Sequence, residues 1–246
     1  MPLKNERVED LTWIRRWIKK GLSKDKKTLD LSNKRITLPV AMDMAENMAV
    51  PGVEILYLNN SWLKDTGMEE LADSDLFQGL RELWLQENKL HSEGAESLAQ
   101  SKHLANLRKL CLWGNKIGPE GAEALAESEI LENLEELDLS FNRVGDAGAA
   151  ALAASSTLNR LKVLHLDANG IGAPGFRALA GARGLPALEA LHLTYNRFEP
   201  EGYEAFYQSG KIRSLKLFKS DAPPPDEEEP RNEKRRPRRP SRPPLA

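Results

Sequence analysis

The sequence predicts an α/β solenoid, in which a short strand and a helix repeat along the chain. Seven positions that recur with a period of 27 support this prediction: Lys34, Ser61, Asn88, Asn115, Asn142, Asn169 and Asn196. An apolar residue lies five positions before each of them, another lies three before, and another two after. A period sustained over this length is typical of a solenoid, in which each unit buries its apolar face only against its neighbours.

Composition and charge argue against several other classes of protein. The 246 residues carry a formal net charge of -2, which gives no general reason to expect nucleic acid or membrane as a partner. No apolar run is long enough to span a bilayer, and the charged segment 1–20 lacks the apolar core of a signal peptide. The single cysteine excludes an intramolecular disulfide and suits a reducing compartment. We therefore expect a cytoplasmic protein.

The pattern divides the chain into an N-terminal helical cap (1–27), the solenoid (28–220) and a tail (221–246). Residues 6–22 have helical spacing, with acidic residues at the start and basic residues at the end, which complements the helix dipole. We expect this helix to cover the exposed edge of the first strand. A basic amphipathic helix that lies on a membrane is the alternative.

Eight short strands are expected, and a helix should follow each of the first seven. The strands are predicted at 29–31, 56–58, 83–85, 110–112, 137–139, 164–166, 191–193 and 215–217. Strands and helices in alternation give a parallel sheet with helices on its outer face. The last interval, from Leu191 to Leu215, is shorter than the others, so the last unit is predicted to be a truncated cap.

The predicted helices share a glycine that recurs with the same period, at Gly67, Gly94, Gly121, Gly148, Gly175 and Gly202. A glycine at one place in every helix suggests a close approach between helix and strand, because elsewhere it would only weaken the helix. Asp65 and Asp146 lie near the starts of their helices, and we expect them to cap those helices.

The repeat Leu-x-x-Leu-x-Leu-x-x-Asn-x-Ile-Gly, followed by a helix rich in glycine and alanine, resembles the ribonuclease-inhibitor-like class of leucine-rich repeats. Segments 101–107 and 124–128 also resemble bacterial-type repeat arrays. The resemblance covers about residues 28–220. It implies a horseshoe with an inner parallel sheet, outer helices and protein-binding use.

The predicted function is a non-catalytic adaptor or scaffold, a monomer that binds a partner protein on its concave sheet face. The resembled class also includes inhibitors, innate-immune sensors and the Ran GTPase-activating protein, so fold alone does not select one activity. A regulator of a small GTPase and an effector or immunity-type protein are the alternatives. GTP turnover by candidate GTPases, measured with and without this chain, would test whether it regulates a small GTPase.

The recurring asparagines are predicted to be structural. In a turn between two apolar residues, a buried asparagine can satisfy backbone N–H and C=O groups that lack sheet partners. The asparagine columns of the resembled class do this, and the residues that match them are Asn88, Asn115, Asn142, Asn169 and Asn196.

The side chains between the paired leucines are expected to line the concave face, because side chains alternate across a strand. Tyr57, Trp84 and Trp113 fall on three adjacent strands and predict one diagonal aromatic patch, with Trp62 and Phe141 at its edges. Aromatic residues are typical interface anchors. Scattered surface aromatics with no role are the alternative.

Further outward residues of the strands are predicted to contact the partner. They form two columns that run across the sheet, and the first of these columns is predicted to end at Lys216. These residues are an exposed Cys111 and the polar residues Asp138, His165, Asp167 and His192. Two imidazoles beside carboxylates could chelate zinc, but no short ligand spacing supports a metal site. Ser140 near His165 does not predict a hydrolase, because no strained turn or oxyanion hole is visible. We therefore predict no catalytic, cofactor-binding or metal-binding residue.

The tail has no apolar periodicity and is predicted to be disordered, with an acidic proline-rich part followed by an arginine-rich part. The arginines suit an anionic partner, either nucleic acid, anionic lipid or an acidic protein. A run of this kind that only keeps the chain soluble is the alternative.

Overall fold

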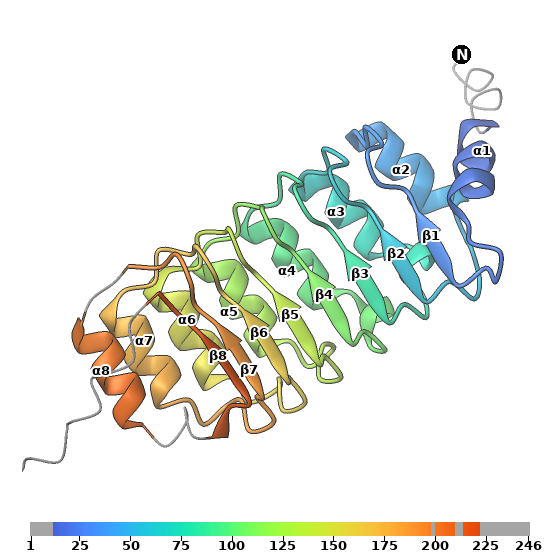
Figure 1. The fold of residues 1–246 in the computed structure, drawn as a ribbon. Helices are drawn as coiled ribbons and strands as arrows, with labels where there is room; N and C mark the ends of the chain where they lie inside the picture. Colours follow the sequence, from blue (N-terminus) through green and yellow to red (C-terminus); the bar gives the residue numbers. More distant parts are fainter. Residues whose placement is uncertain (1–11, 198–199, 210–213, 222–246) are drawn as a thin grey trace, which may run out of the picture.

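The computed structural model describes residues 12–197, 200–209 and 214–221. Eight strands of three residues each run through this part of the chain, and they form one parallel sheet in sequence order (Figure 1). The strands are β1 (Thr28–Asp30), β2 (Ile55–Tyr57), β3 (Glu82–Trp84), β4 (Lys109–Cys111), β5 (Glu136–Asp138), β6 (Val163–His165), β7 (Ala190–His192) and β8 (Leu217–Lys219). The predicted α/β solenoid is confirmed.

The helices α2 to α8 follow the first seven strands and cover one face of the sheet (Figure 1). We call the opposite face of the sheet the open face. The helices are α1 (Thr12–Gly21), α2 (Leu38–Asn47), α3 (Asp65–Ala72), α4 (Ser92–Gln100), α5 (Pro119–Glu127), α6 (Gly145–Ala154), α7 (Ala173–Ala180) and α8 (Pro200–Gln208). Two short 3₁₀ turns, Asp75–Phe77 and Lys102–Leu104, follow α3 and α4.

Leucines set the register of the sheet. Leu56 lies opposite Leu29 on one side and Leu83 on the other, each one repeat away along the chain, and all three are fully buried. A slip of one residue would turn every such leucine to the open face. Burial of this repeated apolar column therefore keeps neighbouring strands offset by one full repeat.

The last strand lies two residues later than predicted. In β8, Phe218 is opposite Leu191, so the regular period continues and the predicted shorter last interval is wrong. Leu215 and Leu217 imitate the spacing of a leucine pair, but Phe218 occupies the inward position. Its ring stacks on that of Phe206 in α8 at 4.7 Å.

This shift changes the end of the open face. Lys219, not Lys216, is the register partner of His192. Lys216 lies just before the strand and forms an ion pair with Glu189 at 2.8 Å. The predicted end of the column at Lys216 is therefore wrong.

The helical glycines allow a close approach, but mainly between neighbouring helices and loops rather than between helix and strand. A Cβ on Gly121 would lie 2.9 Å from the Cα of Ser92 in α4, and one on Gly202 would lie 2.7 Å from the Cα of Ala173 in α7. Both neighbours are backbone atoms of the preceding helix, which cannot move aside cheaply. The glycine column therefore sets the distance between successive helices, and the predicted helix–strand contact is wrong.

The two aspartates at helix starts also act on a neighbour rather than on their own helix. The Oδ1 atom of Asp65 accepts hydrogen bonds from the backbone N–H groups of His91 and Gly94 at the start of α4. Asp146 accepts in the same way from Gly172 and Gly175 at the start of α7. Neither α3 nor α6 has a side-chain cap of its own. Each aspartate therefore caps the helix of the next repeat, and the expectation that it caps its own helix is wrong.

Helix α1 lies against β1 at the N-terminal end of the sheet (Figure 1). Ile14 is buried, while Trp17 and Ile18 pack against the core. Leu22 forms an antiparallel bridge with Leu29. The acidic start of the predicted helix, within residues 6–10, lies outside the described residues, as does the tail from residue 222. No helix in the described ranges is long and apolar enough to cross a membrane.

Candidate functional site

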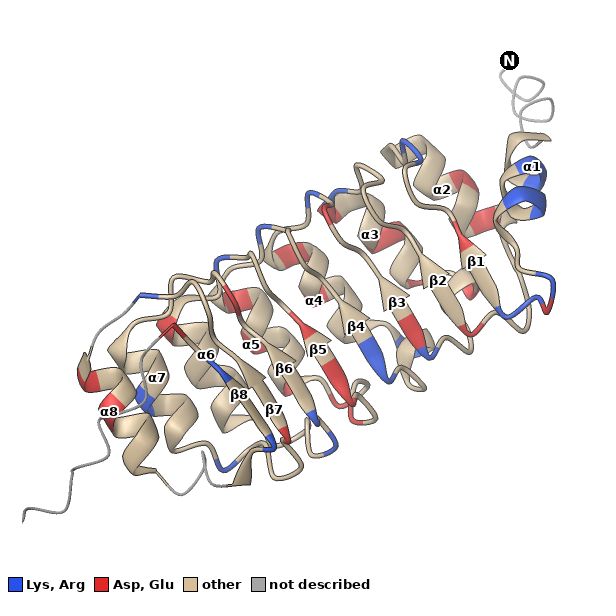
Figure 2. Cartoon of the chain, viewed as in Figure 1, with Lys and Arg blue, Asp and Glu red and all other residues tan. Residues whose placement is uncertain are grey.

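The open face is built from the middle of each repeat, where strand residues alternate between the core and the surface. In β2, Leu56 is fully buried and Tyr57 is half-buried on the open face, and β3 repeats this with Leu83 and Trp84. The acidic and basic strand residues are coloured in Figure 2, which shows acidic positions on β3 and β5 and a basic one on β4 between them.

The first aromatic group on this face consists of Tyr57 and Trp84, which we call the N-terminal pair. Their rings stack with centroids 5.4 Å apart. The Lys109 ammonium lies 4.5 Å from the centroid of the Trp84 ring, and the indole N–H donates to Glu82 at 3.1 Å. A cation over an indole and a bonded N–H fix the orientation of Trp84.

A row of polar and charged side chains continues from Lys109 across the next two strands. Lys109 forms an ion pair with Glu136 at 2.7 Å, and the same Glu136 oxygen lies 3.9 Å from Nε2 of His165. These contacts run without a break from β4 to β6. They join the N-terminal pair to the polar half of the face.

The second aromatic group consists of Trp113, Phe141 and Tyr195, which we call the C-terminal trio. Trp113 contacts Phe141 at a centroid distance of 5.2 Å, and Phe141 contacts Tyr195 at 6.5 Å. Ring contacts among the described residues do not join Trp84 to Trp113, so the single diagonal patch divides into two groups. Trp84 stacks on Tyr57 of the preceding strand, whereas Trp113 makes a tilted contact with Phe141 of the following repeat.

Phe141 and Tyr195 have an unusual backbone conformation, with φ angles of 57° and 58°. They belong to a column of left-handed residues just before the asparagine column: Asn33, Asn60, Glu87, Gly114, Phe141, Ala168 and Tyr195. Asparagine and glycine tolerate this conformation, whereas it costs other residues about 1–2 kcal/mol each. Both rings are nonetheless exposed, at 46% and 72%.

Sequence reasoning missed Tyr195 as a residue of this face. The signal was present, because Tyr195 precedes Asn196 as Phe141 precedes Asn142. Trp62, expected at the edge of the patch, lies instead between two cations. The Lys89 ammonium is 3.7 Å from its ring centroid, and the Arg35 guanidinium is 5.7 Å away.

Cys111 is buried, with only 1% of its surface exposed, and the expectation of an exposed contact residue is wrong. Its small side chain lies below larger neighbours on the face. The thiol is 3.6 Å from an oxygen of Asp138 and accepts from the Gln86 amide at 3.3 Å. Burial, together with the negative charge of Asp138, raises the pKa of Cys111 to about 12.

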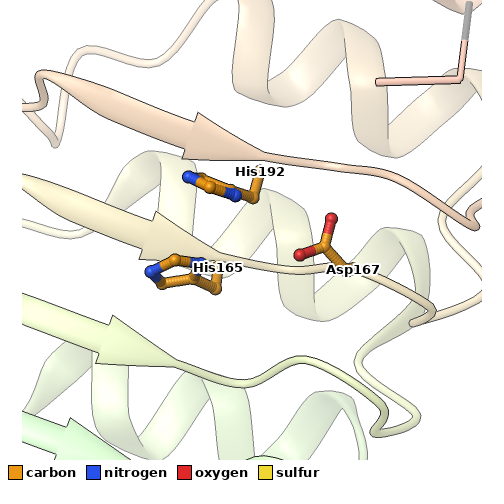
Figure 3. Close-up of side chains that lie close together, drawn as sticks. All are labelled: His165, Asp167 and His192. Atoms are coloured by element: carbon orange, nitrogen blue, oxygen red, sulfur yellow. The ribbon is translucent and has the colours of Figure 1, made fainter. Parts of the chain in front are cut away.

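The polar half of the face brings together His165, Asp167 and His192, as Figure 3 shows. The two histidines are register partners on β6 and β7, with ring centroids 4.2 Å apart. Burial and the neighbouring His165 lower the pKa of His192 below its usual value. Asp167 accepts hydrogen bonds from the backbone N–H and the hydroxyl of Thr194, both at 2.6 Å, through the same oxygen.

The asparagine column forms hydrogen bonds between successive repeats. The Nδ2 group of Asn142 donates to the carbonyls of Leu112 and Leu139, and its Oδ1 accepts from the N–H of Ile117. Corresponding hydrogen bonds from Nδ2 to a carbonyl of the preceding repeat occur at Asn88, Asn115, Asn169 and Asn196. These side chains satisfy backbone groups of the loops.

Two further sets of contacts between successive repeats were not predicted from the sequence. The buried serines Ser101, Ser128 and Ser155 each donate to a carbonyl of the helix in the preceding repeat. A column of charges lies directly before the strands, with ion pairs such as Arg108–Glu135 and Lys162–Glu135 at 2.9 and 2.6 Å. Both follow the period of the repeat. They stabilise the stacking of the repeats.

Four segments of the chain match the family described as leucine-rich repeat: residues 80–99, 103–126, 131–153 and 185–206. Each segment begins before a strand and runs into the helix that follows it, which is the unit seen in the fold. The chain contains leucine-rich repeats. Leucine-rich repeats generally mediate protein–protein interaction, through the extended surfaces that stacked repeats create.

Two solved structures are similar to this chain at low identity. An internalin (inlF) from Listeria monocytogenes str. 4b F2365 is 20% identical, with 78% of this chain and 53% of the internalin covered and a TM-score of 0.49. TLR13, solved as a TLR13–ssRNA13 complex, is 19% identical, with 79% and 32% covered and a TM-score of 0.39. The chain spans about half and about a third of these two proteins. No curated protein matches the chain.

Proposed function

We propose that this leucine-rich-repeat chain is a non-catalytic interaction module that binds a partner protein on its open face. The observation that carries the proposal is the C-terminal trio. Phe141 and Tyr195 expose large aromatic rings from backbone positions that disfavour them, and Trp113 lies beside Phe141. Backbone strain of this kind persists at binding sites, where the side chain serves the ligand rather than the fold.

The two aromatic groups offer anchors of different kinds. The N-terminal pair is half-buried and already stacked, with the Lys109 cation over its indole. The C-terminal trio is more exposed and suits apolar side chains of a partner, since buried aromatic residues commonly dominate the binding energy of an interface.

The acids beside the trio predict the charge of the partner. Asp138 and Asp167 lie on the open face next to Trp113 and Phe141 in the repeat order, and Glu136 extends the acidic surface. Opposite charge at the rim of an interface raises the association rate more than the affinity. We therefore propose a partner segment that combines apolar side chains with lysine or arginine.

We also propose the class of the repeats and the cellular location of the chain. Each of the first seven strands is followed by a full α-helix of 8 to 10 residues, which supports membership of the ribonuclease-inhibitor-like class. The buried, protonated thiol of Cys111 supports a location in the cytoplasm, where thiols stay reduced.

Affinity capture from the native cell tests the proposal. The full chain is compared with a Trp113→Ala/Phe141→Asn variant and, as a matched control, with Trp62→Ala, which removes an exposed tryptophan away from both aromatic groups. We expect the double variant to lose its partner and the control to retain it. A partner held equally by all three proteins would move the interface away from the trio.

A further inference from the structure

We propose that His165, Asp167 and His192 form a binding site for a divalent transition-metal ion of the zinc class on the open face. The three side chains come from adjacent strands or the residues directly after them (Figure 3). One ligand atom from each residue lies within 4.8 Å of the other two. Of the described residues, this group is the one in which histidine, cysteine or carboxylate ligands converge in that way.

The spacing is close to that of a metal site. Zinc holds nitrogen and oxygen ligands at about 2.1 Å, so tetrahedral ligand atoms lie about 3.4 Å apart. Because 4.8 Å is the upper limit of the present separations, each pair of ligand atoms needs to approach by at most about 1.4 Å. All three side chains are half-buried at the surface, so rotation about their own side-chain bonds can provide this change without movement of the strands.

The ligand set is of the kind that zinc accepts. Two imidazoles and one carboxylate occur in zinc sites that keep a fourth position open. The same donors also suit cobalt and nickel, so the proposal concerns the class of ion rather than zinc alone.

The surroundings of Asp167 provide the support that metal ligands need. Its Oδ1 atom is held by both the N–H and the hydroxyl of Thr194 at 2.6 Å. Within the described residues, its Oδ2 atom has one long hydrogen-bond contact, 3.5 Å, with the Ser140 hydroxyl. One oxygen is therefore fixed and the other is available, which is the usual arrangement of a ligating carboxylate.

Nearby charges partly favour a cation. Asp138 is the register partner of His165 on the adjacent strand, and Glu136 lies 3.9 Å from His165 Nε2. Lys219, the register partner of His192, opposes a cation from the other side. Lys219 is exposed on β8, where solvent weakens its effect.

A purely structural role is the competing explanation. Asn59 accepts a hydrogen bond from the N–H of Gln86 as Asp167 does from Thr194, so the Asp167 position can simply tie one repeat to the next. The two histidines would then only stack. That explanation predicts no metal binding, whereas the proposed site predicts one ion per chain.

An ion held by three protein ligands leaves at least one position for water or for a side chain of a partner. This consequence rests on the proposed function, because it places the open position on the binding face. The metal site itself does not, since it can be measured with the chain alone.

Titration of the full chain with ZnCl₂ or CoCl₂ in a non-chelating buffer tests the site. The chain has four histidines, and His91 and His103 lie on the helix side of the repeats. We expect one equivalent of ion to bind and to shift the imidazole signals of His165 and His192 in NMR spectra, while those of His91 and His103 stay in place. No binding up to about 1 mM ion, or shifts confined to His91 and His103, would overturn the proposal.

Two conservative variants sharpen the result. His192→Asn removes one ligand, and Asp167→Asn keeps an oxygen that can accept from Thr194 while the carboxylate charge is lost. Each should weaken binding at least about tenfold, whereas His103→Asn should leave it unchanged. Unchanged affinity in both ligand variants would overturn the site. Circular dichroism without metal shows whether each variant folds. If a variant does not fold, the NMR shifts of the histidines in the unaltered chain decide whether the metal site exists.

Discussion

Phe141 shows at the scale of one residue how binding can conflict with stability. Its φ is 57°, and the equivalent residue one repeat earlier is a glycine, Gly114, with a φ of 70°. Phe141→Asn should relieve the strain and raise the free energy of unfolding by up to about 1 kcal/mol, while partner binding falls. Urea unfolding measures the first effect and capture the second. A clear loss of stability would mean that the ring's contact with Trp113 belongs to the fold.

Asn142 and Trp113 should differ in their effects on stability. Asn142→Ala leaves the buried Ile117 N–H without its acceptor, and it removes one of the two asparagine donors of the Leu112 and Leu139 carbonyls. We therefore expect a loss of about 1–3 kcal/mol in the free energy of unfolding. Trp113→Ala should cost much less, because the ring is half-buried on the open face. Thermal melts of the two variants provide the comparison. The opposite ranking would show that the faces of the sheet are wrongly assigned.

The thiol of Cys111 should react slowly despite its place in the outward column. Its pKa of about 12 leaves almost no thiolate at pH 8, and 1% exposure blocks access. Modification by a thiol reagent at pH 8 should be at least about 100-fold slower in the folded chain than in guanidinium chloride. Rapid modification of the folded chain would show that the strand opens or that the thiol is accessible.

At the scale of single residues, the sequence predicted positions better than contacts. Alternation along the strand correctly placed Trp84 and Trp113 on the open face. It could not predict that Trp84 turns to Tyr57 and Trp113 to Phe141, because the rotamer depends on which neighbour offers a ring. The burial of Cys111 also depends on the size of the neighbouring side chains. The spacing of the repeats does not predict that size.

At the scale of the element, the helices depend on their neighbours for capping. Asp146 is in α6, yet its carboxylate accepts from Gly172 and Gly175 at the start of α7. Asp146→Ala should lower the free energy of unfolding by about 0.5–2 kcal/mol and expose the first turn of α7. Hydrogen exchange should become faster at Gly172 and Gly175 and stay unchanged at the start of α6.

Asp146→Asn is the matched control, because the amide oxygen can still accept both hydrogen bonds. It should retain most of the stability that Asp146→Ala loses. Faster exchange at the start of α6 instead would mean that the aspartate acts within its own helix after all.

The elements themselves followed from the sequence wherever the repeat was regular. Seven strands were predicted within one residue because leucines at fixed spacing define the buried column. The eighth was misplaced because Phe218 replaces the leucine while Leu215 and Leu217 mimic a pair. Capping across repeats was not predictable, since it depends on the distance between helices, which the glycine column sets in three dimensions.

At the scale of the whole molecule, the chain is a stack in which each repeat contacts only its neighbours, so stability should vary along it. Leu137 lies in the central strand β5 between β4 and β6, whereas β8 pairs, within the described residues, with β7 alone. Leu217 of β8 is 42% exposed. The C-terminal end should therefore open locally before the centre does.

Two truncations at equivalent inward positions test this difference. Leu137→Ala removes a fully buried side chain with neighbours on both sides and should lower the global free energy of unfolding by about 2–5 kcal/mol. Phe218→Ala should mainly speed hydrogen exchange in β8 and α8, while β4 and β5 keep their protection. If Phe218→Ala instead lowers protection equally in every strand, the solenoid unfolds as one unit and the coupling between repeats exceeds their local differences in stability.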